Sequence, residues 1–348
     1  MNADLLQRRV LALMAGSTAD SFERLALDVF AFQFENCAVY RAYCEHQQRT
    51  PATVDHWTRI PAVPTSAFKD FALTTFPVEQ AVAEFHTSGT TRGQSGRHFF
   101  ATTDVYDAAA RRSFREHLLP DDAQLPMLAL LPSPAEAPHS SLSHMIGVVG
   151  GEDVEFFVDR GALLMEKLTQ RLCEAQWDSQ PVMVLGTAFA FVHFFDTHPT
   201  FQLPEGSRAM ETGGFKGRSR EVSKRELHAM FERCLGVPGF RVVNEYGMTE
   251  LSTQFYDESF VRGRASDGKR EPPWARVQII DPVSGTEAAM GQPGMIRVFD
   301  LANIGSAACV QTEDLGVRHE DGGFEVRGRM AGAEVRGCSL NAESLSLT

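Results

Sequence analysis

Apolar residues near the start of the chain recur at the spacing of amphipathic helices. Between Ser21 and Gln47 they lie three or four positions apart, which predicts one helix face packed against a core. Thr18, Asp20 and Ser21 precede the segment's first apolar residue or adjoin it and are candidate N-caps. The short apolar run at residues 5–16 predicts a further N-terminal helix. The periodic positions are Phe22, Ala26, Phe30, Phe34, Cys37 and Tyr40.

Beyond this helical region, short strand-like runs alternate with helical patterns. This alternation predicts parallel α/β layers. After about residue 270 the pattern changes to short strands separated by Gly, Pro and Asp turns, which predicts a small, mostly antiparallel β subdomain. The expected strands are 81–88, 97–103, 127–133, 181–187, 275–281, 294–300 and 323–329, and the expected helices are 104–118, 162–176 and 223–236.

The same patterns predict how the chain is divided. An α/β core is expected over residues 1–260, with a helical segment over 1–50. The small β subdomain is expected over 270–330 and a C-terminal tail over 331–348. Residues 261–273 are the only stretch with the composition of a linker.

Composition and charge narrow the class of protein. Of the 348 residues, 43% are hydrophobic and 22% are charged, which is typical of a globular chain with a sizeable core. The formal net charge is −12 and the basic residues are scattered, so neither a nucleic acid nor an anionic membrane is an expected partner. The longest nearly apolar run, 182–195, is too short to span a bilayer. A soluble protein with a small-molecule partner is expected.

The cysteines indicate the redox compartment. Six are present, without a C-x-x-C pair or a regular spacing, so neither a disulfide framework nor a zinc site is predicted. This usage favours the reducing cytoplasm.

The first candidate for chemistry is the loop in "EFHTSGTTRGQSGRHFF", residues 84–100. Glycines let the backbone approach a ligand closely, and hydroxyl and N–H donors in a small space suit polyphosphate oxygens. A solvated hairpin turn is the alternative. The lysine-bearing P-loop pattern is absent, so phosphate binding would also use Arg92 or Arg97 and a metal. The loop residues are Ser88, Gly89, Thr90, Thr91 and Gly93.

The second candidate is "NEYGMTEL", residues 244–251. Tyr246 beside Gly247 can present its ring as a stacking platform for a base. Thr249 and Glu250 add a hydroxyl and a carboxylate, oxygen ligands that suit Mg²⁺ bridging phosphates. The alternative is an ordinary strand end followed by a helix cap.

Together these motifs resemble the adenylate-forming superfamily of acyl-CoA synthetases, adenylation domains and luciferases. "TSGTT" and "YGMTE" carry the likeness, and "METGGF" (210–215), "QTEDLG" (311–316) and "VRGR" (326–329) follow the superfamily pattern. Within it, "IPAVPTSAFK", "LLPSPAEAPHSSLSHM" and "EVRGCSL" resemble LuxE, the acyl-protein synthetases of bacterial fatty acid reductase complexes. This second likeness extends over nearly the whole chain.

The resemblance implies layered α/β subdomains like the large N-terminal domain of adenylate-forming enzymes, without the full mobile C-terminal domain. It implies an enzyme that uses ATP and Mg²⁺ to convert a carboxylic acid, expected to be a fatty acid, into an acyl-adenylate. The acyl group would then move to a cysteine near the C-terminus, here Cys338, for delivery to an acyl-reductase or an acyl-carrier or thioesterase partner. Arg336 and Gly337 would give that thiol positive charge and a flexible approach.

The resemblance also assigns individual roles. Ser88, Gly89, Thr90, Thr91 and Gly93 would hold the phosphates, and Gly213, Gly214, Tyr246 and Gly247 would frame the adenine. Thr249 and Glu250 would face the α-phosphate, with Glu250 on the metal. Asp314 would bind the ribose and Arg329 the ribose or a phosphate. The apolar segment 186–195 is a candidate for part of the acyl pocket, with core packing as the alternative.

The sequence departs from the superfamily's phosphate-loop pattern in two ways, and other functions therefore stay open. Arg92 separates the two threonines from Gly93, and the lysine that usually follows is missing. One alternative is a stand-alone ligase that passes the acyl group to coenzyme A or a carrier protein, with Cys338 incidental. The other is a non-catalytic nucleotide-binding subunit that organises a reductase partner.

Overall fold

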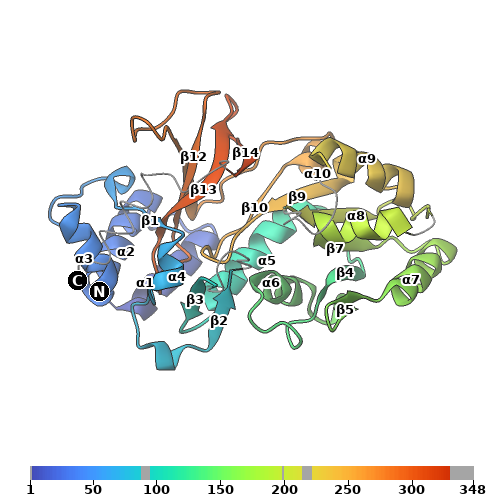
Figure 1. Ribbon diagram of the computed structural model, residues 1–348, viewed down its shortest axis with the longest axis horizontal. Coiled ribbons are helices and arrows are strands. Elements are labelled where there is room, and N and C mark those ends of the chain that lie inside the picture. Colours follow the sequence, from blue (N-terminus) through green and yellow to red (C-terminus); the bar gives the residue numbers. More distant parts are fainter. Residues whose placement is uncertain (1, 88–94, 198–199, 214–221, 330–348) are drawn as a thin grey trace. The chain divides into compact units, whose positions relative to one another are not determined.

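The computed structural model describes residues 2–87, 95–197, 200–213 and 222–329 (Figure 1). Contacts divide the chain into two compact units. Unit 1 comprises residues 1–109, 248–253 and 270–348, and unit 2 comprises residues 110–247 and 254–269. Each unit therefore combines segments that are distant in sequence. The division into 1–260, 270–330 and 331–348 stays a prediction.

The N-terminal part of unit 1 is helical. Ser21 caps α2, since its side chain accepts a hydrogen bond from the Arg24 amide. The prediction of one helix from Ser21 to Gln47 is wrong at Cys37, whose backbone is extended and separates α2 from α3. The apolar period continues across this break because both helices face the same core. The helices are α1 (Ala3–Met14), α2 (Phe22–Asn36) and α3 (Ala38–His46).

Unit 1 also contains a five-stranded sheet and a separate hairpin. The expected antiparallel strands after residue 270 are present, and β1 adds to them in parallel with β13. The rings of Phe22 and Phe299 make an edge contact that joins α2 to β12. The sheet strands are β1 (Val63–Pro64), β11 (Ala275–Ile280), β12 (Pro293–Asp300), β13 (Cys309–Arg318) and β14 (Phe324–Arg329); the hairpin is β2 (Ala83–His86) and β3 (Arg97–Phe100).

Unit 2 is built on a seven-stranded sheet in the order β10-β9-β8-β7-β4-β5-β6. Five neighbouring strands, from β9 to β5, run parallel, and the antiparallel β10 and β6 close the two edges. Followed along the chain, the parallel strands have the doubly wound order 2-1-3-4-5, in which ligands bind at the carboxyl ends. The strands are β4 (Met127–Pro132), β5 (Val154–Asp159), β6 (Ala162–Leu163), β7 (Met183–Thr187), β8 (Arg208–Thr212), β9 (Val242–Tyr246) and β10 (Phe255–Tyr256).

Helices cover both faces of this sheet. One apolar cluster joins α7, α8 and α9 to Leu128, Val184 and Ala209. Helix α6 ends in a tight turn into β5, where a Cβ on Gly150 would be 2.6 Å from the Cβ of Val154. The helices are α5 (Asp104–Leu118), which crosses the division between the units, α6 (Ser141–Gly150), α7 (Met165–Trp177), α8 (Ala188–Thr197), α9 (Lys224–Leu235) and α10 (Ser259–Arg262).

Short helical elements complete the path of the chain. The four-residue helix α4 (Ala67–Asp70) follows β1 directly. Among the described residues, no helix has both the length and the apolar composition needed to cross a membrane. The 3-10 turns are η1 (Trp57–Arg59), η2 (Val78–Gln80), η3 (Gly151–Asp153) and η4 (Gly239–Arg241).

The segment considered for an acyl pocket, 186–195, lies mainly in the core of unit 2. Phe191, Val192 and Phe194 are buried in the cluster that packs on the sheet. A Cβ on Gly186 would lie 3.1 Å from the Cβ of Leu130, so there is little free space beside this glycine. Core packing, the alternative reading, accounts for these side chains.

Candidate functional site

The predicted site residues fall into three groups. Unit 1 holds Thr249, Glu250, Asp314 and Arg329. Unit 2 holds Gly213, Tyr246 and Gly247. The others lie outside the described residues: Ser88, Gly89, Thr90, Thr91, Gly93, Gly214 and Cys338.

Thr249 is joined to both strands of the β2–β3 hairpin. The Thr249 hydroxyl donates to the His86 carbonyl at 3.1 Å. The Thr249 carbonyl oxygen lies 2.8 Å from Nδ1 of His98. The hairpin is closed where Thr87 and Gly96 exchange two hydrogen bonds, from the Thr87 amide to the Gly96 carbonyl and from the Gly96 amide to the Thr87 hydroxyl. The fold thus brings the described hairpin residues on either side of 88–94 close to Thr249.

His98 supports this arrangement and was not singled out from the sequence. It is almost fully buried, and this burial lowers its pKa to about 4, so the ring is neutral near pH 7. A carbonyl oxygen only accepts, so Nδ1 must carry the proton and donate to Thr249. A histidine within the otherwise apolar end of β3 was the available sequence signal.

Glu250 is a buried carboxyl group among charged neighbours. Its side chain and backbone are only 8% exposed, and burial raises the pKa of its carboxyl group to about 7. The charge of Asp314 raises this pKa further, whereas the charges of Arg329 and Lys69 lower it. The Glu250 carbonyl accepts a hydrogen bond from the Asn303 amide group at 2.8 Å, which fixes the backbone. The carboxyl group can therefore change its charge near neutral pH.

Strand register brings Asp314 and Arg329 together. They are direct partners across β13 and β14, and Nε of Arg329 lies 3.4 Å from Oδ1 of Asp314. Asp314 is buried, while the Arg329 side chain is 76% exposed. Two residues that the sequence places on separate motifs thus form one charged pair within unit 1.

In unit 2 the candidate residues follow the carboxyl ends of β8 and β9. A Cβ on Gly213 would meet no atom of the described part of the chain within 4 Å. A Cβ on Gly247 would instead lie 2.3 Å from Oε1 of Glu245, so a larger residue here would require the Glu245 side chain to move. Burial raises the pKa of Glu245 to about 7, and a hydrogen bond with Thr212 partly offsets that increase.

A buried charged network braces these same strand ends. Nζ of Lys269 donates to the Asn244 carbonyl at 3.0 Å, and the Asn244 amide donates to Glu211 at 2.8 Å. Asp257 pairs with Lys224 at 2.9 Å and with Lys269 through a backbone bridge. Lys269 lies in the segment 261–273 of linker-like composition, yet it is buried because acidic and carbonyl partners from distant segments surround it. The division between the two units falls directly after it.

Asp300 holds the chain immediately after Glu250. Its carboxylate accepts from the amides of Ser252 and Thr253, from the Thr253 hydroxyl and from the Ala302 amide, at 2.7 to 2.9 Å. All four donors are satisfied by one fully buried side chain. The position of Glu250 therefore depends on Asp300.

We expect Asp300→Asn to lower the free energy of unfolding by about 2 to 4 kcal/mol, because an amide has one acceptor oxygen and would turn its own NH₂ group toward donors. Urea denaturation measures this change. Asp281→Asn is the control, since Asp281 accepts similar bonds in an exposed turn of the same sheet and should have little effect. Equal loss in both variants would contradict this account of Asp300.

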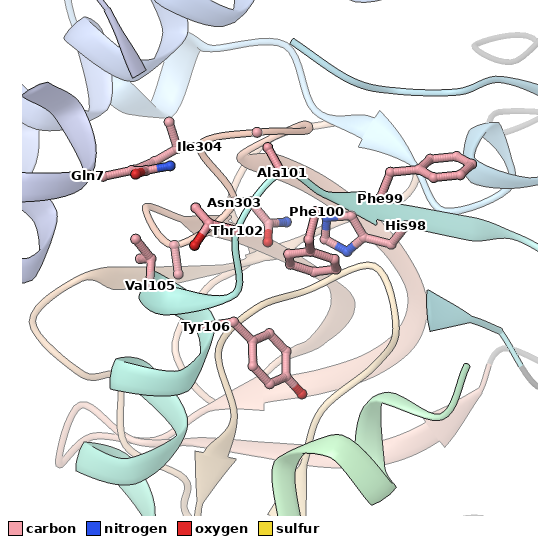
Figure 2. A pocket seen from close by; sticks show the side chains of 12 residues that line it. Gln7, His98, Phe99, Phe100, Ala101, Thr102, Val105, Tyr106, Asn303 and Ile304 are labelled. Atoms are coloured by element: carbon pink, nitrogen blue, oxygen red, sulfur yellow. The ribbon is translucent and has the colours of Figure 1, made fainter. Parts of the chain in front are cut away.

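None of the described site residues predicted from the sequence lines either of two small cavities. Within unit 1, a cavity of about 30 Å³ is lined by His98, Phe100, Tyr106 and Asn303 among others (Figure 2). This volume accommodates a water molecule but no nucleotide or acyl chain. A second cavity of about 230 Å³ in unit 2 lies beside Met127, at the amino end of β4. It is therefore remote from the carboxyl ends where doubly wound sheets bind ligands.

Comparisons with known proteins agree with the motifs. The family profile described as "Acyl-protein synthetase, LuxE" matches residues 2–346. A curated relative, the long-chain-fatty-acid–luciferin-component ligase of Aliivibrio fischeri, is 22% identical over 310 residues, which are 86% of this chain and 79% of the relative.

Solved structures support the fold. A 2-hydroxyisobutyryl-CoA ligase in complex with 2-HIB-AMP and CoA is similar with a TM-score of 0.65 and 14% identity, over 90% of this chain and 76% of the ligase. ATP-bound MatB from Rhodopseudomonas palustris has a TM-score of 0.53 and 17% identity over 74% of this chain. The chain spans 50% of the length of MatB. The predicted resemblance and the layered α/β fold class are confirmed.

Proposed function

The chain belongs to the acyl-protein synthetase family LuxE, and from this we propose that it activates a carboxylic acid with ATP and transfers the acyl group to Cys338. The observation that carries the proposal is the Thr249–Glu250 segment, held against the hairpin that flanks residues 88–94. The Asp314–Arg329 pair supports it, because the charge of each acts on Glu250. The order of these motifs in the sequence agrees with adenylate formation.

The proposed reaction has two steps. In the first, a carboxylate oxygen of the acid attacks the α-phosphorus of ATP, the bond to the bridging oxygen breaks, and pyrophosphate leaves. In the second, the Cys338 thiolate attacks the acyl carbon, a thioester forms, and AMP leaves with the electron pair of the cleaved C–O bond. The thiol proton passes to solvent. Both steps need orientation of the reactants and charge neutralisation more than a strong acid or base.

Each predicted site residue that the structure describes has a proposed role in the first step. Thr249 and Glu250 face the α-phosphate, and Asp314 binds the ribose hydroxyls. Arg329 contacts the ribose or a phosphate oxygen, since its exposed guanidinium is held at one end by Asp314. Gly213, Tyr246 and Gly247 frame the adenine. Orientation by these side chains would supply most of the catalytic effect.

The residues around Glu250 fit a magnesium ion held together with the nucleotide. Mg²⁺ in such sites uses one or two carboxylates plus substrate phosphates. The described residues contain no cluster of three or more acidic, histidine or cysteine side chains that would bind a metal without substrate. Ionised Glu250 would hold the ion, and the bound ion would neutralise charge on the phosphate oxygens. A nearby divalent cation also favours ionisation of a carboxyl group whose pKa is raised by burial.

The name of the Aliivibrio fischeri relative supports a long-chain fatty acid as substrate. We propose a fatty acid for this chain also, with an acyl-reductase as the partner that takes the acyl group from Cys338. The cytoplasm is the proposed location.

Acid-dependent exchange of labelled pyrophosphate into ATP tests the first step. Fatty acids of increasing length and a set of aromatic acids are supplied with Mg²⁺, and exchange above the no-acid control is expected with fatty acids. Exchange with acyl transfer to free coenzyme A would instead favour the stand-alone ligase. ATP binding without exchange for any acid would favour the non-catalytic subunit.

A further inference from the structure

Lys69 lies on a short element that is held rigidly in unit 1. Its helix, α4, follows β1, which pairs in parallel with β13, and the Thr65 amide donates to the Gln311 carbonyl at 3.1 Å. The neighbouring Phe68 is buried and its ring meets the His98 ring edge-on at 5.6 Å. Through Phe68, the chain beside Lys69 therefore packs against His98, the residue that donates to Thr249.

The Lys69 side chain runs beside the closed base of the β2–β3 hairpin. A Cβ built on Gly96 would lie 3.5 Å from Cγ of Lys69 and 3.0 Å from Cγ2 of Thr87. Lys69 is exposed. Its ammonium group is also close enough to Glu250 for its charge to lower the pKa of that carboxyl group. The Lys69 side chain therefore lies beside the hairpin base, and its charge acts on Glu250.

Two other described cations near this hairpin, Arg97 and Arg329, are arginines with different contacts. Arg97 on β3 lies 4.0 Å from Glu84 and places its guanidinium over the Phe99 ring. Arg329 is held by Asp314. Lysine is a compact point charge on a flexible stem and is a common ligand of phosphate in nucleotide sites. Lys69 is the lysine among these three cations, so its chemistry suits a polyphosphate best.

We propose that Lys69 binds the β- and γ-phosphates of ATP, the part that leaves as pyrophosphate, and so replaces the lysine that the loop after Thr91 lacks. The proposal rests on the proposed function, because it requires ATP as a substrate. Thr249, Glu250 and the Asp314–Arg329 pair are assigned to the α-phosphate and ribose. Lys69 then supplies positive charge on the side of the hairpin base.

Calorimetric binding of ATP and of AMP to the whole protein, without any acid, tests this role. In Lys69→Gln the Kd for ATP should rise by about 10-fold to 100-fold, the range of a lost charge-assisted contact, while the Kd for AMP should change little. Lys69→Arg should recover part of the loss. Lys167→Gln is the matched control, the same substitution at an exposed lysine on α7 that has no proposed role in the site, and should affect ATP far less.

Several outcomes would overturn the role of Lys69. Unchanged ATP affinity in Lys69→Gln would do so, as would an equal loss for ATP and AMP. An unchanged thermal midpoint is expected for this exposed residue and separates a lost contact from a damaged fold. Wild-type protein that binds ATP but exchanges no pyrophosphate with any acid would contradict the proposed enzyme while leaving the Lys69 result intact. A wild-type protein that binds no ATP would overturn both.

Discussion

Cys338→Ser should lose the acyl-protein adduct almost completely, by several orders of magnitude relative to wild type, while pyrophosphate release continues. The thiolate is the nucleophile of the second step, and a serine hydroxyl without a base is far less reactive toward an acyl-adenylate. Intact-mass spectrometry after incubation with Mg²⁺, ATP and a fatty acid measures the adduct. Sensitivity to hydroxylamine identifies it as a thioester.

The remaining cysteines offer a matched control. Cys173 is exposed on α7, so Cys173→Ser removes an accessible thiol and should leave the adduct unchanged. Cys44 and Cys309 are buried, and burial raises the pKa of each to about 12, which leaves little thiolate near neutral pH. An adduct that persists in Cys338→Ser would show that another residue accepts the acyl group. A thioester on coenzyme A with no protein adduct in wild type would favour the stand-alone ligase.

Local patterns predicted the fold well where an element is defined by its own side chains. The helix expected at 104–118 corresponds to α5, and the strands expected after residue 270 correspond to β11, β12 and β14. The break at Cys37 was missed because α2 and α3 bury the same apolar face, so the period continues through the break. The pairing of β1 with β13 could not be predicted, because it joins segments far apart in the sequence and a local pattern contains no information on such pairs.

The candidate site was predictable as a set of motifs but not as a set of contacts. "YGMTE" identified Thr249 and Glu250, yet their supports, His98, Asn303 and Asp300, come from segments far away along the chain. Lys269 appeared to be in a linker because its own neighbours are polar, whereas its partners lie on β9 and near α10. Long-range electrostatic pairing decides the position of such residues, and single-sequence patterns do not contain it.

Glu250→Gln should make the protein more stable above neutral pH and much less active. The raised pKa means that the folded state binds the Glu250 proton more tightly than the unfolded chain does. The stabilisation from this proton is complete below pH 4.5 and is lost as the pH rises through about 7. Its loss costs on the order of 3 kcal/mol, and the neutral glutamine removes this pH dependence. Urea denaturation at pH 5 and pH 8 measures the difference.

The pH should affect activity in the direction opposite to its effect on stability: as the pH rises, stability falls and activity increases. If ionised Glu250 holds Mg²⁺ beside the α-phosphate, wild-type pyrophosphate exchange rises with pH in a range below about 7, because the bound ion favours the ionised carboxylate. Exchange by Glu250→Gln falls by roughly 10²-fold to 10³-fold, with a weaker Mg²⁺ dependence. Glu245→Gln is the matched control, because burial also raises the pKa of Glu245 to about 7. It should alter stability in the same way but retain the Mg²⁺ dependence. A Glu250→Gln variant with wild-type exchange and Mg²⁺ dependence would remove the metal-binding role, since burial alone would then explain the properties of this carboxyl group.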